Sequence, residues 1–217
     1  MGDFLLKNDQ TILFIGDSIT DCGRRDQFAP LGNGYVKLFD EIVMALQPEL
    51  RLKIINTGIS GNKVDELRAR WHDDVMRYDL DWLSVKIGIN DIHRQLGTPG
   101  GPFSVEQFAA DYEAILAQTA RGKKKARFIL IDPFYISTDL SGMGFRTSVL
   151  RLLDEYLAVV EGLAKKHNAI HLKTHTMFQR MLKHHTPDDF CPEPVHPYRS
   201  GHLAIALELY RLLGGTL

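Results

Sequence analysis

The 217-residue sequence lacks several features that would place it in a specialised class of protein. It has only two cysteines, Cys22 and Cys191, too few for a disulfide framework in a chain of this length. No apolar run is long enough to span a bilayer, and the first ten residues contain neither a long apolar segment nor a cleavage signal. We therefore expect two free thiols, no membrane span and a cytoplasmic location.

Charge of one sign is not in excess either. The chain carries 26 Lys and Arg against 27 Asp and Glu, which gives a net charge of -1 and no electrostatic footprint for nucleic acid. A Walker A phosphate loop, a G-x-G-x-x-G fingerprint and the G-x-S-x-G elbow of α/β-hydrolases are also absent. We therefore expect no nucleic-acid partner and no nucleotide cofactor.

What the chain does have is an alternation of short apolar segments and stretches with helical spacing. Short segments rich in Ile, Val, Leu and Phe are typical of strands buried on both faces of a parallel sheet. The expected strands are 12–15, 52–55, 82–87, 127–131 and 169–172, and the apolar helical stripes lie within 35–46, 108–119, 150–163 and 203–212. This pattern predicts a single domain over residues 1–217, with α/β architecture and a central parallel sheet covered by helices on both faces.

The first expected strand runs directly into Gly16-Asp17-Ser18-Ile19-Thr20. A turn at this point would present the Ser18 hydroxyl at the carboxyl edge of the sheet, which is where ligands bind in open parallel α/β sheets. Ser18 is therefore a candidate nucleophile. The alternative interpretation is an ordinary helix N-cap, for which Asp and Ser are both common.

A serine nucleophile needs a base, usually a histidine that a third group orients. Among the nine histidines, His196 stands out because it lies in Glu193-Pro194-Val195-His196-Pro197, where the prolines restrict the backbone just before the last helical stripe. Glu193, three residues earlier, is placed to reach the ring nitrogen of His196 that faces away from Ser18. The alternative is a surface loop with an unrelated acid and histidine.

Acyl transfer also needs hydrogen-bond donors for the oxyanion. The segment 56–62 follows the second expected strand, and its Gly61 permits close approach of a backbone N–H. The segment 88–91 follows the third, and Asn90 offers a side-chain amide. We expect Ser18 N–H, Gly61 N–H and the Asn90 amide to form a three-donor oxyanion hole, although each segment alone is also typical of an ordinary turn.

Taken together, Ser18, Gly61, Asn90 and His196 resemble the four sequence blocks of the SGNH hydrolase superfamily, which includes the GDSL esterases and lipases. The phrases at 16–24, 56–62 and 87–91 are similar to those of bacterial carbohydrate esterases of the xylan acetylesterase type. The resemblance implies a three-layer α/β/α fold with about five parallel strands in flavodoxin-like order. It also implies a carboxylic ester hydrolase that deacetylates a sugar, and an association into homo-oligomers.

Two positions depart from the family pattern. Glu193 stands where the family usually has Asp, so Asp188 and Asp189 remain alternatives for the group that orients His196. His93 stands where similar carbohydrate esterases tend to carry Trp, and this change beside the oxyanion donor would alter which acyl or sugar group fits.

Four further residues are expected to support the site or contact substrate: Asp17, Asp91, His93 and Arg24. We expect Asp17 and Asp91 to hold loops through backbone hydrogen bonds. Trp71 is expected to pack in the core, with an interface as the alternative. His171 and His175 have i, i+4 spacing but lack the Glu of a His-Glu-x-x-His motif, so no metal site is expected.

The sequence therefore predicts a serine esterase, without metal or cofactor, that acts on short acyl esters of a small molecule or oligosaccharide. One alternative uses the same residues on a lipid, a lysophospholipid or a thioester. A second, from another class, is a non-catalytic carbohydrate-binding protein on the same fold.

Overall fold

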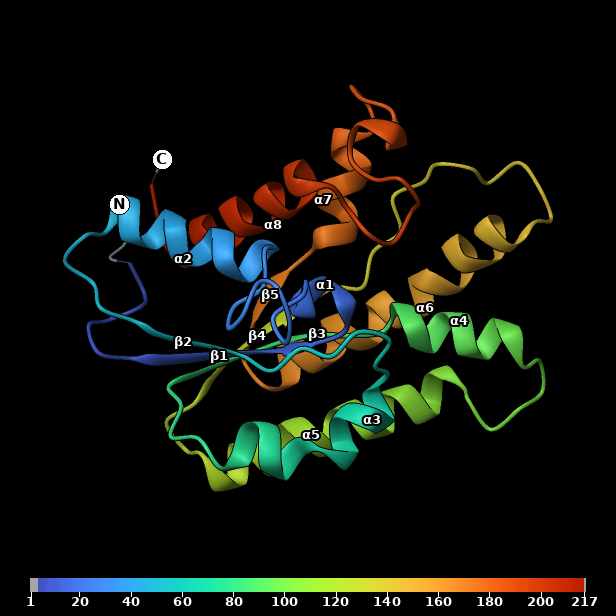
Figure 1. The fold of residues 1–217 in the computed structure, drawn as a ribbon. Coiled ribbons are helices and arrows are strands. Elements are labelled where there is room, and N and C mark those ends of the chain that lie inside the picture. The colour runs from blue at the N-terminus through green and yellow to red at the C-terminus, as the bar shows by residue number, and fades with distance from the viewer. Residues whose placement is uncertain (1–3, 217) are drawn as a thin grey trace.

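The fold is built on one sheet whose five strands are all parallel. The computed structural model describes residues 4–216. Its strands are β1 (Thr11–Gly16), β2 (Lys53–Asn56), β3 (Trp82–Lys86), β4 (Arg127–Ile131) and β5 (Ile170–Leu172), in the order β2-β1-β3-β4-β5 (Figure 1). Each expected strand is present to within two residues at either end, and the order is the flavodoxin-like one.

Helices cover both faces of this sheet. They are α1 (Ser18–Asp21), α2 (Tyr35–Leu46), α3 (Val64–Ala69), α4 (Ile89–Gly97), α5 (Val105–Gly122), α6 (Phe145–Lys166), α7 (Thr174–Met181) and α8 (Arg199–Leu212), with a π-helical turn at His72–Met76 and a 3-10 turn at Pro187–Asp189. In Figure 1, α2 and α8 pack together above the sheet, whereas α3 and α5 lie below it, with α6 against α5. The predicted three-layer α/β/α architecture is confirmed.

Burial on both faces explains why the strands read as continuous apolar runs. Ile12, Leu13, Phe14 and Ile15 of β1 are fully buried, as a central strand between two helical layers requires. Trp71 is buried as well, and its indole N–H donates to Thr119 Oγ1 of α5 at 2.9 Å. Trp71 is therefore a packing residue, as predicted, and not part of an exposed interface.

The parallel register brings separate turns to one edge of the sheet. Gly16 at the end of β1 pairs with Lys86 at the end of β3, and Phe14 of β1 pairs with Asn56 at the end of β2. The segments that follow these three strands therefore leave the sheet side by side. A Cβ atom on Gly16 would lie 2.2 Å from the Lys86 carbonyl oxygen, so only glycine allows β1 and β3 to meet this closely before the turn.

Gly16→Ala should lower the free energy of unfolding by about 1–3 kcal/mol, because a backbone carbonyl cannot move aside without distorting β3. Gly162→Ala is the matched control. It lies inside α6, where a Cβ would meet open space among the described residues, and should raise stability by up to about 1 kcal/mol through helix propensity. Urea denaturation of both variants tests this, and wild-type stability in Gly16→Ala would contradict it.

Candidate active site

Ser18, His196 and Glu193 lie in a row at the carboxyl edge of the sheet. Ser18 is the first residue of α1, and its Oγ is 2.8 Å from His196 Nε2. On the other side of the imidazole, Nδ1 is hydrogen-bonded to Glu193 Oε1. Because a carboxylate accepts the proton of Nδ1–H, Nε2 is left as the acceptor for the serine hydroxyl.

The Glu193 carboxylate is fixed by its own loop. Oε1 also accepts the backbone N–H of His196 at 2.8 Å, and Oε2 accepts that of Val195 at 3.0 Å. Burial alone would raise the pKa of Glu193, but these N–H donors and the imidazole outweigh it and lower the pKa. The carboxyl group is therefore ionised at neutral pH.

The two alternative carboxylates lie elsewhere. Asp189 accepts the backbone N–H and hydroxyl of Thr186 at 2.9 and 3.1 Å and so caps the 3-10 turn, while Asp188 is exposed in the same turn. The structure thus places Glu193, and neither aspartate, against His196. The longer Glu side chain is accommodated because it curls back onto the backbone of the same loop.

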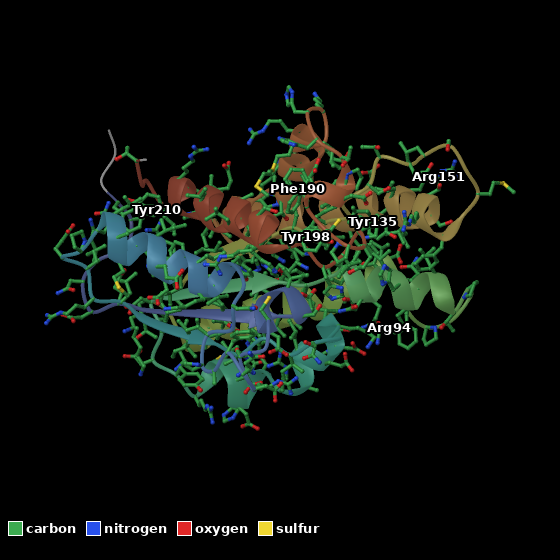
Figure 2. All side chains as sticks on the ribbon, turned by 45° about the horizontal axis from the view of Figure 1, so that its top comes forward. Arg94, Tyr135, Arg151, Phe190, Tyr198 and Tyr210 are labelled. Carbon is green, nitrogen blue, oxygen red and sulfur yellow. The ribbon has the colours of Figure 1, made fainter. Side chains whose placement is uncertain are left out.

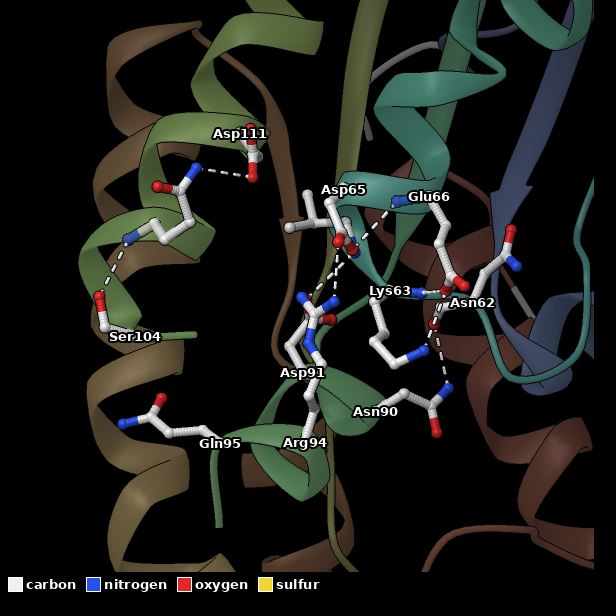
Figure 3. Close-up of polar contacts among 12 residues, drawn as sticks. Asn62, Lys63, Asp65, Glu66, Asn90, Asp91, Arg94, Gln95, Ser104 and Asp111 are labelled. Atoms are coloured by element: carbon white, nitrogen blue, oxygen red, sulfur yellow. Dashed lines mark hydrogen bonds and ion pairs between the residues drawn. The ribbon is translucent and has the colours of Figure 1, made fainter. Parts of the chain in front are cut away.

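Gly61 and Asn90 face the same cavity as Ser18 and His196, which has a volume of about 590 Å³. Asn90 donates one amide hydrogen to the carbonyl of Asn62 at 3.1 Å, and this contact fixes the side chain beside the loop of Gly61 (Figure 3). An amide NH₂ has two hydrogens, so a second remains for a bound group. Gly61 has a φ of +81°, a conformation that favours glycine.

Asp17, the residue before Ser18, forms a buried ion pair with Lys86. Lys86 Nζ lies 3.1 and 3.3 Å from the two carboxylate oxygens of Asp17, and both side chains are at most 1% exposed. Asp17 also accepts the backbone N–H of Ile19 at 3.0 Å, the kind of contact expected of it. Because a buried charge without its partner is strongly unfavourable, this pair fixes the residue next to Ser18 in one position.

Asp91 plays a similar part beside the segments that carry Gly61 and Asn90. Its Oδ1 accepts the N–H of Val64 at 3.1 Å, at the start of α3, and lies 3.6 Å from Arg94 (Figure 3). Burial raises the pKa of Asp91 to about 7. Through its hydrogen bond with the N–H of Val64, Asp91 ties α4, which carries Asn90, to the segment that carries Gly61.

Arg24 supports a loop beside the site, whereas His93 packs among aromatic side chains. Arg24 donates Nε–H to the carbonyl of Gly58 at 2.6 Å and so supports the loop after β2. His93 packs against the rings of Tyr135 and Phe145, and burial lowers its pKa. His93 is not among the residues that line the cavity next to Ser18.

Cys22 lines the cavity with His202, and the two are in contact. His202 Nδ1 accepts the backbone N–H of Tyr35 at 3.2 Å, which leaves its proton on Nε2, 3.5 Å from Cys22 Sγ. Burial raises the pKa of Cys22 to about 12 and lowers that of His202 to about 4. The thiol is therefore protonated at neutral pH and a weak nucleophile.

Arg70 is a residue that sequence reasoning did not single out. Its guanidinium donates to the carbonyl of Thr57 at 2.7 Å and to Asn62 Oδ1 at 2.8 Å, and it reaches the carbonyl of Gly16 at 3.4 Å. Asp74, in the π-helical turn, pairs with it. One side chain thus joins the segments that follow β1 and β2.

Two further expectations from the sequence are that there is no metal site and no membrane-spanning helix. Within residues 4–216, no group of three His, Cys, Asp or Glu side chains is arranged to hold a metal, and His171 pairs with Asp132 at 2.6 Å. In the same range, no helix is both long and apolar enough to cross a membrane.

Comparison with known proteins identifies a family and close structural neighbours. Residues 14–204 match the GDSL-like Lipase/Acylhydrolase family. An acetylxylan esterase from Geobacillus stearothermophilus is 37% identical over 214 residues, which cover 94% of each chain.

Solved structures extend the match to the whole fold. A catalytic mutant of Axe2, an acetylxylan esterase from G. stearothermophilus, is 34% identical and superposes with a TM-score of 0.88, covering 98% of this chain and 97% of that one. LAE5, an α/β hydrolase from the metagenome of Lake Arreo, Spain, is 30% identical with a TM-score of 0.87 over 98% of both chains. Axe2 structures described as catalytic mutants carry alanine in place of a serine, an aspartate or a histidine.

Arg70→Met should lower kcat for p-nitrophenyl acetate about tenfold to a hundredfold, with a smaller effect on KM, because small displacements of positioned groups slow the chemical step. Arg70→Lys should recover part of the loss. Arg68→Met is the matched control: Arg68 lies in the last turn of α3, of which Arg70 is the C-cap residue, is more than half exposed and pairs with Asp111 at 2.6 Å. Equal kcat values in Arg70→Met and Arg68→Met would contradict the positioning role.

Proposed function

The chain belongs to the GDSL-like lipase/acylhydrolase family and is a carboxylic ester hydrolase, and from this premise we propose that it is a serine esterase that removes acetyl groups from carbohydrate. The observation that carries the proposal is the contact of 2.8 Å between Ser18 Oγ and His196 Nε2, with Glu193 hydrogen-bonded to the far side of the imidazole. Residues 1–217 form, on this proposal, a single hydrolase domain.

The reaction follows from the proton positions. His196 Nε2 takes the hydroxyl proton as Ser18 Oγ attacks the ester carbonyl, and Glu193 stabilises the imidazolium that forms. The N–H groups of Ser18 and Gly61 and the Asn90 amide stabilise the oxyanion. The tetrahedral intermediate expels the sugar oxygen, which receives the proton from His196. Water, activated by His196 in turn, attacks the acetyl-enzyme and releases acetate and free Ser18.

Glu193 is proposed as the third member of the triad. It is the carboxylate that contacts His196 Nδ1, and two backbone N–H groups hold it there. The Axe2 catalytic mutants support the assignment, because the aspartate replaced in one lies three residues before the histidine replaced in another, as Glu193 lies before His196.

Acetylated carbohydrate is the proposed substrate class for two reasons. An acetylxylan esterase is among the relatives that match over nearly the whole chain. The cavity next to Ser18 also presents polar side chains, including Asn33, Ser60 and Arg199. These side chains can form hydrogen bonds with the hydroxyl groups of a sugar, whereas a long acyl chain would leave them without partners. The cytoplasmic location and the association into homo-oligomers remain predictions.

Glu193→Ala should lower kcat about a thousandfold or more, because His196 loses the partner that fixes its tautomer and stabilises its charge. Asp188→Ala and Asp189→Ala serve as controls and should keep kcat within about twofold, since neither carboxylate contacts His196. Steady-state hydrolysis of p-nitrophenyl acetate measures all three. A large loss in either aspartate variant, with a small one in Glu193→Ala, would transfer the triad role.

The substrate class is tested by acetate release from acetylated xylose and xylo-oligosaccharides, together with p-nitrophenyl esters of increasing acyl length. We expect acetate from the sugars and a kcat/KM that falls beyond the acetyl ester, because a long apolar chain would leave the polar side chains of the cavity without hydrogen-bond partners. Ser18→Ala is the control for background hydrolysis. Activity that rises towards long acyl chains would instead support a lipolytic esterase.

A further inference from the structure

A second cavity of about 550 Å³ adjoins the catalytic one. It lies between the loop that precedes α2, the first turns of α2 and the start of α8. Asn33 and Arg199 line both cavities, so a ligand bound at Ser18 would pass these two side chains to enter the second cavity. The proposed mechanism uses no residue of this second cavity.

The walls of the second cavity combine an aromatic surface with balanced charge. Phe28 is 39% exposed. Lys37 and Arg199 both approach Glu41, at 3.9 and 3.7 Å, and Lys37 also pairs at 3.0 Å with Asp40, which lies beside the cavity but does not line it. Counting Asp40, two carboxylates match the two positive side chains, so the cavity favours neither an anion nor a cation.

The loop that carries Phe28 is held in place before any ligand arrives. Gly32 N–H donates to the Phe28 carbonyl at 2.7 Å, Asn33 N–H donates to the Cys22 carbonyl at 3.0 Å, and the Asn56 amide donates to the Leu31 carbonyl at 2.8 Å. The ring of Phe28 lies over Gly23, where an added Cβ would come within 3.0 Å of it. A preformed wall of this kind loses little conformational entropy on binding.

We propose that this second cavity binds the neighbouring sugar unit of an acetylated, uncharged oligosaccharide whose acetylated unit lies at Ser18. The apolar C–H face of that unit packs on Phe28, and its hydroxyl groups bond to Asn33, Lys37 and Glu41. A neutral, polyhydroxylated ring with one apolar face fits a cavity that has an exposed aromatic ring and no net charge. The proposal rests on the proposed carbohydrate esterase function.

The experiment compares kcat/KM for acetylated xylotriose with that for acetylated xylose, each divided by kcat/KM for p-nitrophenyl acetate in the same protein. In the wild type, the trisaccharide should be preferred by about fivefold or more, because binding of the remote unit contributes to reaction of the acetylated one. Phe28→Ala should remove most of this preference. Phe28→Leu, which keeps an apolar side chain but no ring, should do the same.

Leu212→Ala is the matched control. Leu212 has the same exposed fraction as Phe28, 39%, but it ends α8 at the opposite end from Arg199; in Figure 2, Tyr198 and Tyr210 mark these two ends. This variant should keep the wild-type preference. Circular dichroism confirms that each variant is folded, and Phe28→Leu carries the test if Phe28→Ala is not.

The outcomes separate this inference from the function on which it rests. Acetate release from acetylated xylose without any preference for the trisaccharide, or with a preference that both Phe28 variants retain, overturns the sugar-binding role of the second cavity and leaves the esterase function standing. Hydrolysis of p-nitrophenyl acetate without acetate release from any sugar overturns the carbohydrate function and, with it, this inference.

Discussion

The constraint on which the whole site depends is that all five strands are parallel. Their carboxyl ends meet at one edge, so the segments after β1, β2 and β3 must emerge together there, although Ser18, Gly61 and Asn90 are far apart in the sequence. The loop before α8 then needs only to return to this edge to bring His196 to Ser18. The fold supplies the meeting point, and the turns supply the reactive groups.

Around this edge, charged side chains hold the turns in fixed positions. The pair of Asp17 and Lys86 lies next to Ser18, Asp91 holds the start of α3 next to the helix that carries Asn90, and Arg70 bonds to the carbonyls of Gly16 and Thr57. Each of these contacts acts on backbone groups or on a buried partner. The donors proposed for the oxyanion are therefore oriented before a substrate binds, which is the condition under which such donors lower a barrier most effectively.

Much of this arrangement could be predicted from the sequence because strands and turns have local signals. The five apolar segments were identifiable from their composition, and Ser18, Gly61 and Asn90 from their residue types just after three of these segments and from the resemblance to the SGNH blocks. Lys86 also gave a signal, since a lysine in a strand buried on both faces must have a charged partner. Arg70 gave none, because two of its four partners are backbone carbonyls, which every residue has. The choice among Glu193, Asp188 and Asp189 depended on a loop conformation in which the N–H groups of Val195 and His196 bond to the Glu193 carboxylate.

The central claim is that Ser18 is the nucleophile, activated by His196. Labelling with a serine-directed fluorophosphonate at neutral pH, followed by mass spectrometry of the digested protein, tests it most directly. The account predicts one adduct, on Ser18, that is lost in Ser18→Ala and forms at least about a hundredfold more slowly in His196→Ala. No adduct, or an adduct on another serine that persists in Ser18→Ala, would contradict it.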